Sequence, residues 1–181
     1  MGVFVKAAGT WTEIAASKAL IKWAVATGGT ETTYTVGDIN WKAHTFGANG
    51  TLTVSVAGQV EVMVISGGSG RENALMSSGG GGPVWEGIKT VTTGAKACDV
   101  GQGGGAANGP GNQGVPSSFD GFCPGQAGSY LGGPNGGGYG LAGYVSSISG
   151  TSVTYSLGGG ATPGSTALNG VAGTVIVRYQ V

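Results

Sequence analysis

The chain has 181 residues, of which 41 are glycine, about three times the share found in an average protein. Only 9% of the residues are charged, and eight basic residues balance eight acidic ones, so the sequence lacks the basic cluster that binds nucleic acid. No apolar run approaches the roughly 20 residues of a membrane span, and the N-terminus lacks a secretory signal pattern; we therefore expect a protein made in a cytoplasm and not inserted in a membrane.

The first 26 residues differ from the rest and are predicted to form an attachment segment. Residues 3–6 (VFVK) and 10–14 (TWTEI) are typical of short strands, whereas residues 13–23 (EIAASKALIKW) are compatible with a short helix. The residues of this segment that we expect to make the attachment are aromatic or aliphatic: Phe4, Trp11, Ile14 and Trp23.

The sequence from residue 30 to 65 has the alternation of β-strands. Within residues 50–58 (GTLTVSVAG), Leu52, Val54 and Val56 fall on one face and hydroxyl residues on the other, which predicts a half-buried strand. Residues 59–66 (QVEVMVIS) become apolar on both faces, which is typical of a central strand. The Ala-Gly pair between these two strands is compatible with a tight hairpin turn.

A glycine-rich insertion separates this region from the C-terminus. Residues 66–173 hold 33 of the glycines, and residues 174–181 hold none. The closing segment TVIVRY (174–179) is predicted to pair with VMVI (62–65) in one sheet. This pairing would hold both ends of the insertion and make it part of the fold. Weaker strand signals lie inside it, at residues 88–93 and 143–157.

The backbone conformation of the insertion has three alternatives. A flexible linker is disfavoured because the region carries bulky aromatic residues, and collagen is excluded because the glycine spacing is irregular and the chain has only six prolines. The third alternative is tightly packed extended backbone, either strands or polyglycine helices, whose polar groups satisfy one another. We predict the third.

No catalytic, cofactor or metal site is predicted. Residues 101–106 (GQGGGA) have the spacing of a dinucleotide fingerprint, but the sequence that follows cannot form the required helix. His44 is the sole histidine and is expected to be structural. Between residues 97 and 173 the charged side chains are Asp99 and Asp120, too few for an acid–base cluster. We therefore expect no enzyme and no cofactor.

Two cysteines, Cys98 and Cys123, allow either a disulfide or two free thiols. A disulfide would add about 3 kcal/mol of stability by restricting the unfolded chain.

Aromatic residues in the glycine-rich region are either the local core or contacts for a saccharide or a protein surface. The candidates for receptor contact are Phe119, Phe122, Tyr130, Tyr139 and Tyr144.

Several motifs occur in a recognisable order along the chain. They are His-x-Phe at 44–46, GTLTV at 50–54, a Val-rich strand and glycine block at 60–70, VGQGG at 100–104 with SSF at 117–119, and GTVIVRY at 173–179. In this order they resemble the glycine-rich domain of tailed-bacteriophage virion proteins, over residues 27–181.

The resemblance implies a non-enzymatic virion structural protein, most often a tail fibre, fibre-tip adhesin or minor tail protein. It implies an all-β fold: a β-sandwich-like domain with long glycine-rich loops or with polyglycine-II-like segments. In related fibre-tip adhesins, packed polyglycine helices carry loops that touch the host receptor. Here the segment 71–78 interrupts the first glycine block, and both backbone alternatives stay open.

Under this hypothesis residues 1–26 attach to other virion proteins, and residues 27–181 form an exposed domain of N-terminal strands (30–65), glycine-rich insertion (66–173) and closing strand (174–181). The protein would be a homotrimer on the virion surface or tail, assembled in the host cytoplasm, and its receptor a host cell-surface glycan or protein. A capsid decoration or head-fibre protein is the alternative, and a glycine-rich antifreeze-type protein is disfavoured by the irregular glycine spacing.

Overall fold

The fold is given by a computed structural model that describes residues 3–7, 10–14, 21–70, 79–105, 112–123, 143–155 and 169–181. The protein is all-β, with its strands paired in antiparallel sheets and no helix among the described residues. Residues 13–23 are compatible with a short helix by sequence, but residues 13 and 14 end a strand and residues 21–23 are not helical; residues 15–20 lie outside the described ranges.

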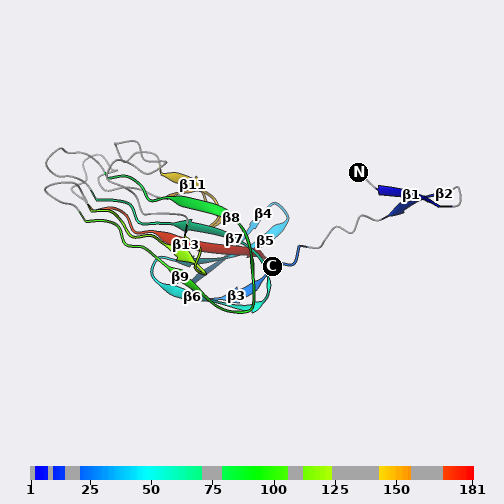
Figure 1. Ribbon diagram of the computed structural model, residues 1–181, viewed down its shortest axis with the longest axis horizontal. Coiled ribbons are helices and arrows are strands. Elements are labelled where there is room, and N and C mark those ends of the chain that lie inside the picture. Colours follow the sequence, from blue (N-terminus) through cyan, green and yellow to red (C-terminus); the bar gives the residue numbers. More distant parts are fainter. Residues whose placement is uncertain are drawn as a thin grey trace.

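Five strands form the larger sheet, in the order β4-β5-β13-β7-β8 (Figure 1). Their bounds are β4 (Thr30–Val36), β5 (Ile39–Phe46), β13 (Thr174–Gln180), β7 (Gly58–Ile65) and β8 (Val84–Val91). Strand β13 lies between β5 and β7, with Val175 opposite Val64 and Val177 opposite Val62. The predicted pairing of the closing segment with VMVI is confirmed, and the glycine-rich insertion is held by strands at both ends.

Four strands form the smaller sheet, in the order β10-β9-β6-β3. Their bounds are β10 (Ser118–Phe119), β9 (Gly94–Asp99), β6 (Gly50–Val56) and β3 (Val25–Thr27). Strands β6 and β7 thus lie in different sheets, and the hairpin turn predicted between them is wrong. The reason is that β7 begins against the incoming chain: the Gln59 N–H donates to the Lys22 carbonyl at 2.7 Å, and the Gln59 carbonyl accepts from Ala24 N–H at 3.0 Å.

The two sheets face each other across an apolar core. From β7, Val60, Val62 and Val64 are each 0% exposed, and from β6 the core receives Leu52 and Val54. These are the positions that strict alternation selects in each strand. The arrangement is a β-sandwich, in agreement with the expected fold class.

A third layer covers the outer face of the larger sheet. It is a hairpin of β11 (Tyr144–Ser146) and β12 (Val153–Tyr155), with Ile148 between them. Ile148 is 1% exposed and packs with Met63 and Ile65, the outward residues of β7. Strand β7 is therefore buried on both faces, as its two-sided apolar sequence predicts.

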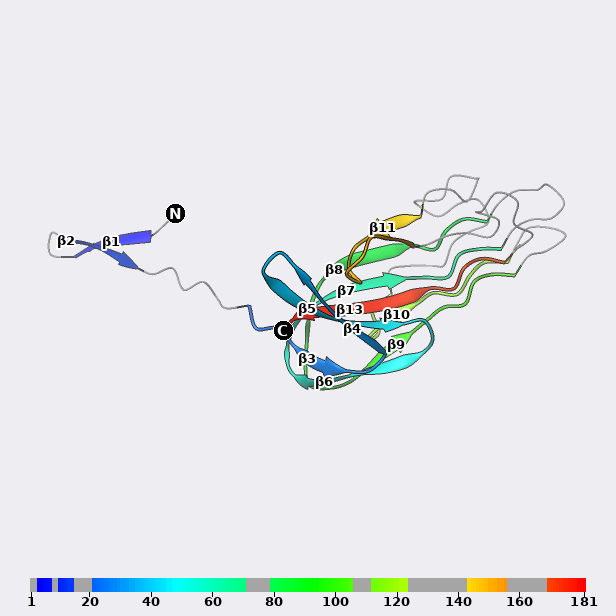
Figure 2. The same cartoon turned by 180° about the vertical axis from the view of Figure 1, so that it is seen from behind.

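Beyond one end of the sandwich, five described segments continue the strands as extended chain (Figure 2). Residues 66–70 leave β7, 79–83 enter β8, 100–105 leave β9, 112–117 enter β10 and 169–173 enter β13. We call these five segments the glycine bundle, because they bond to one another through their backbones.

The hydrogen bonds of the central segment, residues 66–70, repeat every three residues. Ser66 and Ser69 donate their N–H groups to one neighbour, at the Pro83 and Gly80 carbonyls, with N···O distances of 3.1 and 2.9 Å. The Gly67 and Gly70 N–H groups donate at 2.9 Å to a second neighbour, at the carbonyls of residues 115 and 112, and Gly68 donates to a third, at residue 171. A β-strand alternates between two sides, whereas a helix of the polyproline-II type has three residues per turn. The polyglycine-II-like alternative is the one that these described segments adopt.

Glycine is required here because the neighbouring backbones leave no room for a side chain. A Cβ atom added to Gly67 would lie less than 3.0 Å from the Gln102 carbonyl oxygen, and one added to Gly104 would lie as close to that of Asn112. Real Cβ atoms are not found at such distances from backbone, so the bundle can form only where these positions lack side chains.

The N-terminal residues form a separate hairpin, β1 (Val3–Ala7) with β2 (Thr10–Ile14), whose register runs from Val3 opposite Ile14 to Ala7 opposite Thr10. The sandwich itself begins earlier than residue 27. Ala24 and Ala26 are at most 1% exposed in its core, and β3 opens at residue 25.

The sandwich has a defined polarity. The chain enters beside Gln59, at the start of β7, and leaves after Gln180, at the end of β13. Both points lie at the end opposite the glycine bundle, because β7 runs toward the bundle and β13 runs away from it (Figure 1).

Candidate functional site

Strand β8 is an edge strand of the larger sheet and presents side-chain groups on both of its faces. One face carries Trp85, whose ring lies 4.7 Å from that of Phe122 at an angle of 57°. Lys89 lies above Phe122, with Nζ 4.1 Å from the ring centre, which is within cation–π range. Gly87 makes room for the indole, since a Cβ there would lie 2.8 Å from a Trp85 ring carbon.

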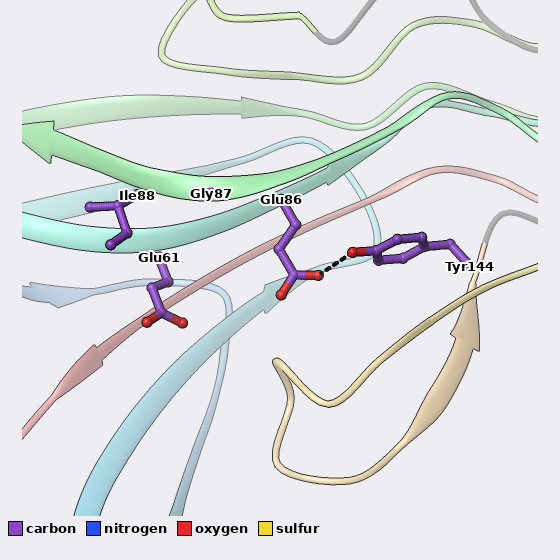
Figure 3. Close-up of a pocket in the computed structure, with 5 residues that line it drawn as sticks. All are labelled: Glu61, Glu86, Gly87, Ile88 and Tyr144. Atoms are coloured by element: carbon purple, nitrogen blue, oxygen red, sulfur yellow. Dashed lines mark hydrogen bonds between the residues drawn. The ribbon is translucent and has the colours of Figure 1, made fainter. Parts of the chain in front are cut away.

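The other face of β8 borders a pocket of about 320 Å³ lined by Glu61, Glu86, Gly87, Ile88 and Tyr144 (Figure 3). The hydroxyl of Tyr144 donates to Glu86 at 3.1 Å, and burial together with this bond to a carboxylate raises the pKa of the tyrosine. Ile88 is 57% exposed at the pocket. The pocket thus combines carboxylate acceptors with an exposed aliphatic side chain.

A polar cluster holds the β11–β12 layer beside this pocket. Arg178 donates through Nε to Glu61 at 2.7 Å and through Nη1 to the Tyr34 hydroxyl at 3.1 Å. Tyr34 in turn donates to the Ile148 carbonyl, and its ring fills the space above Gly150, a residue with φ of 98°. The pKa of Arg178 is raised because its bonds to Tyr34 and Glu61 outweigh the opposing effect of its burial. Arg178 therefore balances the charge of Glu61, whereas among the described residues no cation pairs with Glu86.

The three candidate receptor-contact residues that the structure describes do not form one site. Phe119 is 0% exposed in the core between the sheets, so its predicted role in receptor contact is wrong; β10 turns that side chain inward. Phe122 and Tyr144 are both half-buried, but they lie on opposite faces of β8. Tyr130 and Tyr139 lie outside the described residues.

Sequence reasoning missed the β8 residues that complete these two groups, above all Lys89 and Glu86. The signal was present in VWEGIK (84–89), where Trp85, Gly87 and Lys89 alternate with Glu86 and Ile88 and so share one face of a strand.

Of the candidate attachment residues, Phe4, Trp11 and Ile14 belong to the β1–β2 hairpin. Trp23 is instead part of the sandwich: it packs against the core and lies edge-on to Trp41, with ring centres 5.6 Å apart.

The two cysteines carry no disulfide. Cys98 is buried in β9 and Cys123 is exposed, so the bridge that their number allowed is not formed. Burial raises the pKa of the Cys98 thiol to about 12, which makes it unreactive at neutral pH.

His44 is buried among structural partners. Its Nδ1 donates to the Gly28 carbonyl at 2.8 Å, and Nε2 lies 3.2 Å from the Tyr179 hydroxyl. Burial lowers the pKa of His44. Within the described ranges, no group of three or more His, Cys, Asp or Glu side chains is placed to hold a metal ion. The described residues also contain no helix long and apolar enough to cross a membrane.

Comparisons with known proteins give no relative: no family model, no curated protein and no solved structure matches the chain.

Proposed function

We propose that the protein is a non-enzymatic structural component of a tailed-bacteriophage virion and that it serves in host attachment, as a tail fibre or receptor-binding component. The virion end is the end of the sandwich where the chain enters and leaves. The glycine bundle points away from the particle. The partners are other virion proteins and a host cell-surface glycan or protein.

The observation that carries the proposal is the polarity of the domain. Residues 22–24 and the end of β13 lie at one end of the sandwich, and the bundle extends from the other. The described bundle segments are held to one another by backbone hydrogen bonds, close glycine contacts and buried serine hydroxyls, so this support is built without large side chains. Such a support suits a receptor-binding protein, whose contact residues must change while the scaffold stays the same.

The motif order described for residues 27–181 adds a second line of support, because it resembles the glycine-rich domain of phage virion proteins. The balanced charge of eight basic and eight acidic residues suits a surface that neither binds nucleic acid nor self-repels.

The test uses a phage whose genome encodes this chain. Mass spectrometry of purified particles should detect the protein, and labelling with an antibody to the sandwich should mark the tail tip. An excess of purified full-length protein should slow phage adsorption to host cells by about tenfold, by occupying receptors.

Each result bears on a separate part of the proposal. Absence of the chain from particles overturns the virion assignment. Label on the capsid favours the decoration or head-fibre alternative. Unchanged adsorption at saturating protein overturns the role in host attachment.

A further inference from the structure

The pocket beside β8 is built by side chains that the register of the larger sheet places next to one another. Glu61 on β7 lies directly opposite Ile88 on β8 and, on its other side, opposite Arg178 on β13. Glu86 is two residues from Ile88 and so shares its face of the edge strand. Tyr144 reaches the same space from β11 (Figure 3). The sheet edge and the third layer thus form a recess of about 320 Å³.

The residues that line this pocket offer hydrogen-bond acceptors but no free side-chain donor. Tyr144 carries the one side-chain donor among them, and its hydroxyl donates to Oε2 of Glu86 at 3.1 Å. In Glu61, Oε2 accepts from Arg178 Nε at 2.7 Å and lies 2.6 Å from Nη2. No described residue bonds to Oε1 of either carboxylate. A ligand of this pocket must therefore bring its own donors.

The charge of the pocket favours a cationic donor. Arg178 balances Glu61, whereas among the described residues no cation pairs with Glu86. Lys89 belongs to the same strand but faces its other side, where it lies over the ring of Phe122. An ammonium group complements the remaining negative charge and supplies three donors for the free acceptors.

The exposed aliphatic side chain of Ile88 indicates what carries the ammonium group. It is 57% exposed beside the carboxylates. A lysine side chain can lay its flexible four-carbon stem against this surface while its ammonium group reaches a carboxylate. A hydroxyl-rich sugar would instead leave hydroxyl groups without partners there. Because no described strand pairs with the outer side of β8, a partner chain can approach the pocket from that side.

We propose that this pocket receives a lysine side chain of a partner protein. The ammonium group bonds to Glu86 and to the free oxygen of Glu61, and the carbon stem covers Ile88. That the partner lies on the host surface rests on the proposed function. The lysine site itself is a property of the purified protein and is tested on the protein alone.

The experiment titrates the purified full chain with Nα-acetyl-lysine methylamide and follows the Ile88 methyl and Gly87 amide resonances by NMR. We expect both to shift with a Kd on the order of 1 mM, the range for a fragment of this size. The methyl resonances of Val36, which is similarly exposed on β4, should not shift. The norleucine analogue has the same carbon stem without the amine and should bind about tenfold more weakly.

A matched pair of substitutions locates the contact. Glu86 on β8 and Asp99 on β9 are exposed carboxylates that each accept one hydroxyl bond, from Tyr144 and from Ser118. Glu86→Gln removes the charge but keeps an oxygen for Tyr144, and it should weaken binding about tenfold. Asp99→Asn lies in the smaller sheet and should change binding by less than about twofold. Ile88→Ser should weaken binding by about threefold, through lost apolar contact.

Four outcomes would overturn the proposal. Resonances that stay in place at about 20 times the expected Kd would show that the site does not exist. Equal binding of the norleucine analogue would show a general apolar recess, and tighter binding of glucosamine would assign the pocket to an amino sugar. Equal effects of Glu86→Gln and Asp99→Asn would show a response to overall charge. None of these results bears on the presence of the chain in particles or on phage adsorption, which test the proposed function separately.

Discussion

The sandwich and the glycine bundle are continuous in the chain but are held together in different ways. In the sandwich, side chains such as Leu52 and Val62 fill the space between two sheets. In the bundle, the space between segments is filled by the backbone itself, and the side chains are mostly single hydrogen atoms. A side chain that is too small destabilises the first, and one that is too large destabilises the second.

The difference extends to how polar groups are satisfied. Each sheet pairs its strands in a plane, whereas the central bundle segment bonds to three neighbours in turn. Buried serines complete the bundle: the Ser69 hydroxyl accepts from Gly80 N–H at 2.7 Å, and that of Ser117 accepts from Gly101 N–H at 2.9 Å. A glycine-rich region can therefore be ordered without an apolar core, provided that its backbone groups find partners.

The largest expected effect is in the sandwich. Leu52→Ala removes a side chain that is 0% exposed at the centre of the core and should lower the free energy of unfolding by about 2–5 kcal/mol. Urea denaturation measures the change. Thr51→Ala, at the exposed neighbouring position, should change it by about 0.5 kcal/mol or less. Equal effects of the two substitutions would mean that the core does not lie between these sheets.

The next largest effect is in the bundle, where the substitution adds side-chain volume instead of removing it. Gly104→Ala forces a methyl group against the Asn112 carbonyl and should cost about 2–4 kcal/mol, from overpacking and from strained hydrogen bonds. Among the described atoms, the methyl group of Gly105→Ala would meet only Asn112 Nδ2, at 3.5 Å, so this substitution is the matched control and should be nearly neutral. Hydrogen exchange should show faster opening at Gly68 and Gly70 in the first variant alone. Indistinguishable variants would contradict close backbone packing.

The same contrast explains what the sequence could predict. Alternation places β6, β7 and β13 correctly, because side-chain periodicity records which face is buried. Glycine has no side chain, so a glycine-rich segment shows no pattern of buried and exposed positions. The three-residue period of the bundle is therefore seen only in the backbone hydrogen bonds between segments that are distant in sequence. At Ala57 the chain passes from the smaller sheet to the larger one, and a short Ala-Gly connection is compatible with this passage as well as with the hairpin that the sequence predicts. The contact that decides between them joins Gln59 to Lys22, two residues 37 positions apart in the sequence.

The candidate contact residues show the same limit at single positions. Phe119 and Phe122 are three residues apart in a glycine-rich stretch without regular periodicity, and the turn of β10 buries one and exposes part of the other. The Asp120–Gly121 turn that separates them has φ angles of 49° and 75°. Nothing in the local composition fixes which aromatic ring faces the core.

The smallest expected effect is a pH dependence confined to the sandwich. The described bundle segments contain no ionisable side chain, whereas His44 is buried in the sandwich with a lowered pKa. A histidine whose pKa is lowered by folding binds its proton more readily in the unfolded chain, so stability is fully present above the unfolded value of about 6.5 and is lost as the pH falls toward the folded value.

Between pH 7.5 and 5.5 we therefore expect the free energy of unfolding to fall, by no more than about 1.4 kcal/mol per pH unit, the limit for one proton. His44→Gln should flatten this slope while leaving the acid loss below pH 4.5, where Glu31, whose pKa is lowered by its bond to Lys42, becomes protonated. Exchange of the Gly67–Gly70 amides through local opening of the bundle should not follow the titration. If exchange of these amides instead accelerates as His44 becomes protonated, the bundle and the sandwich unfold together. The two regions would then differ in how they are packed but would share one free energy of unfolding.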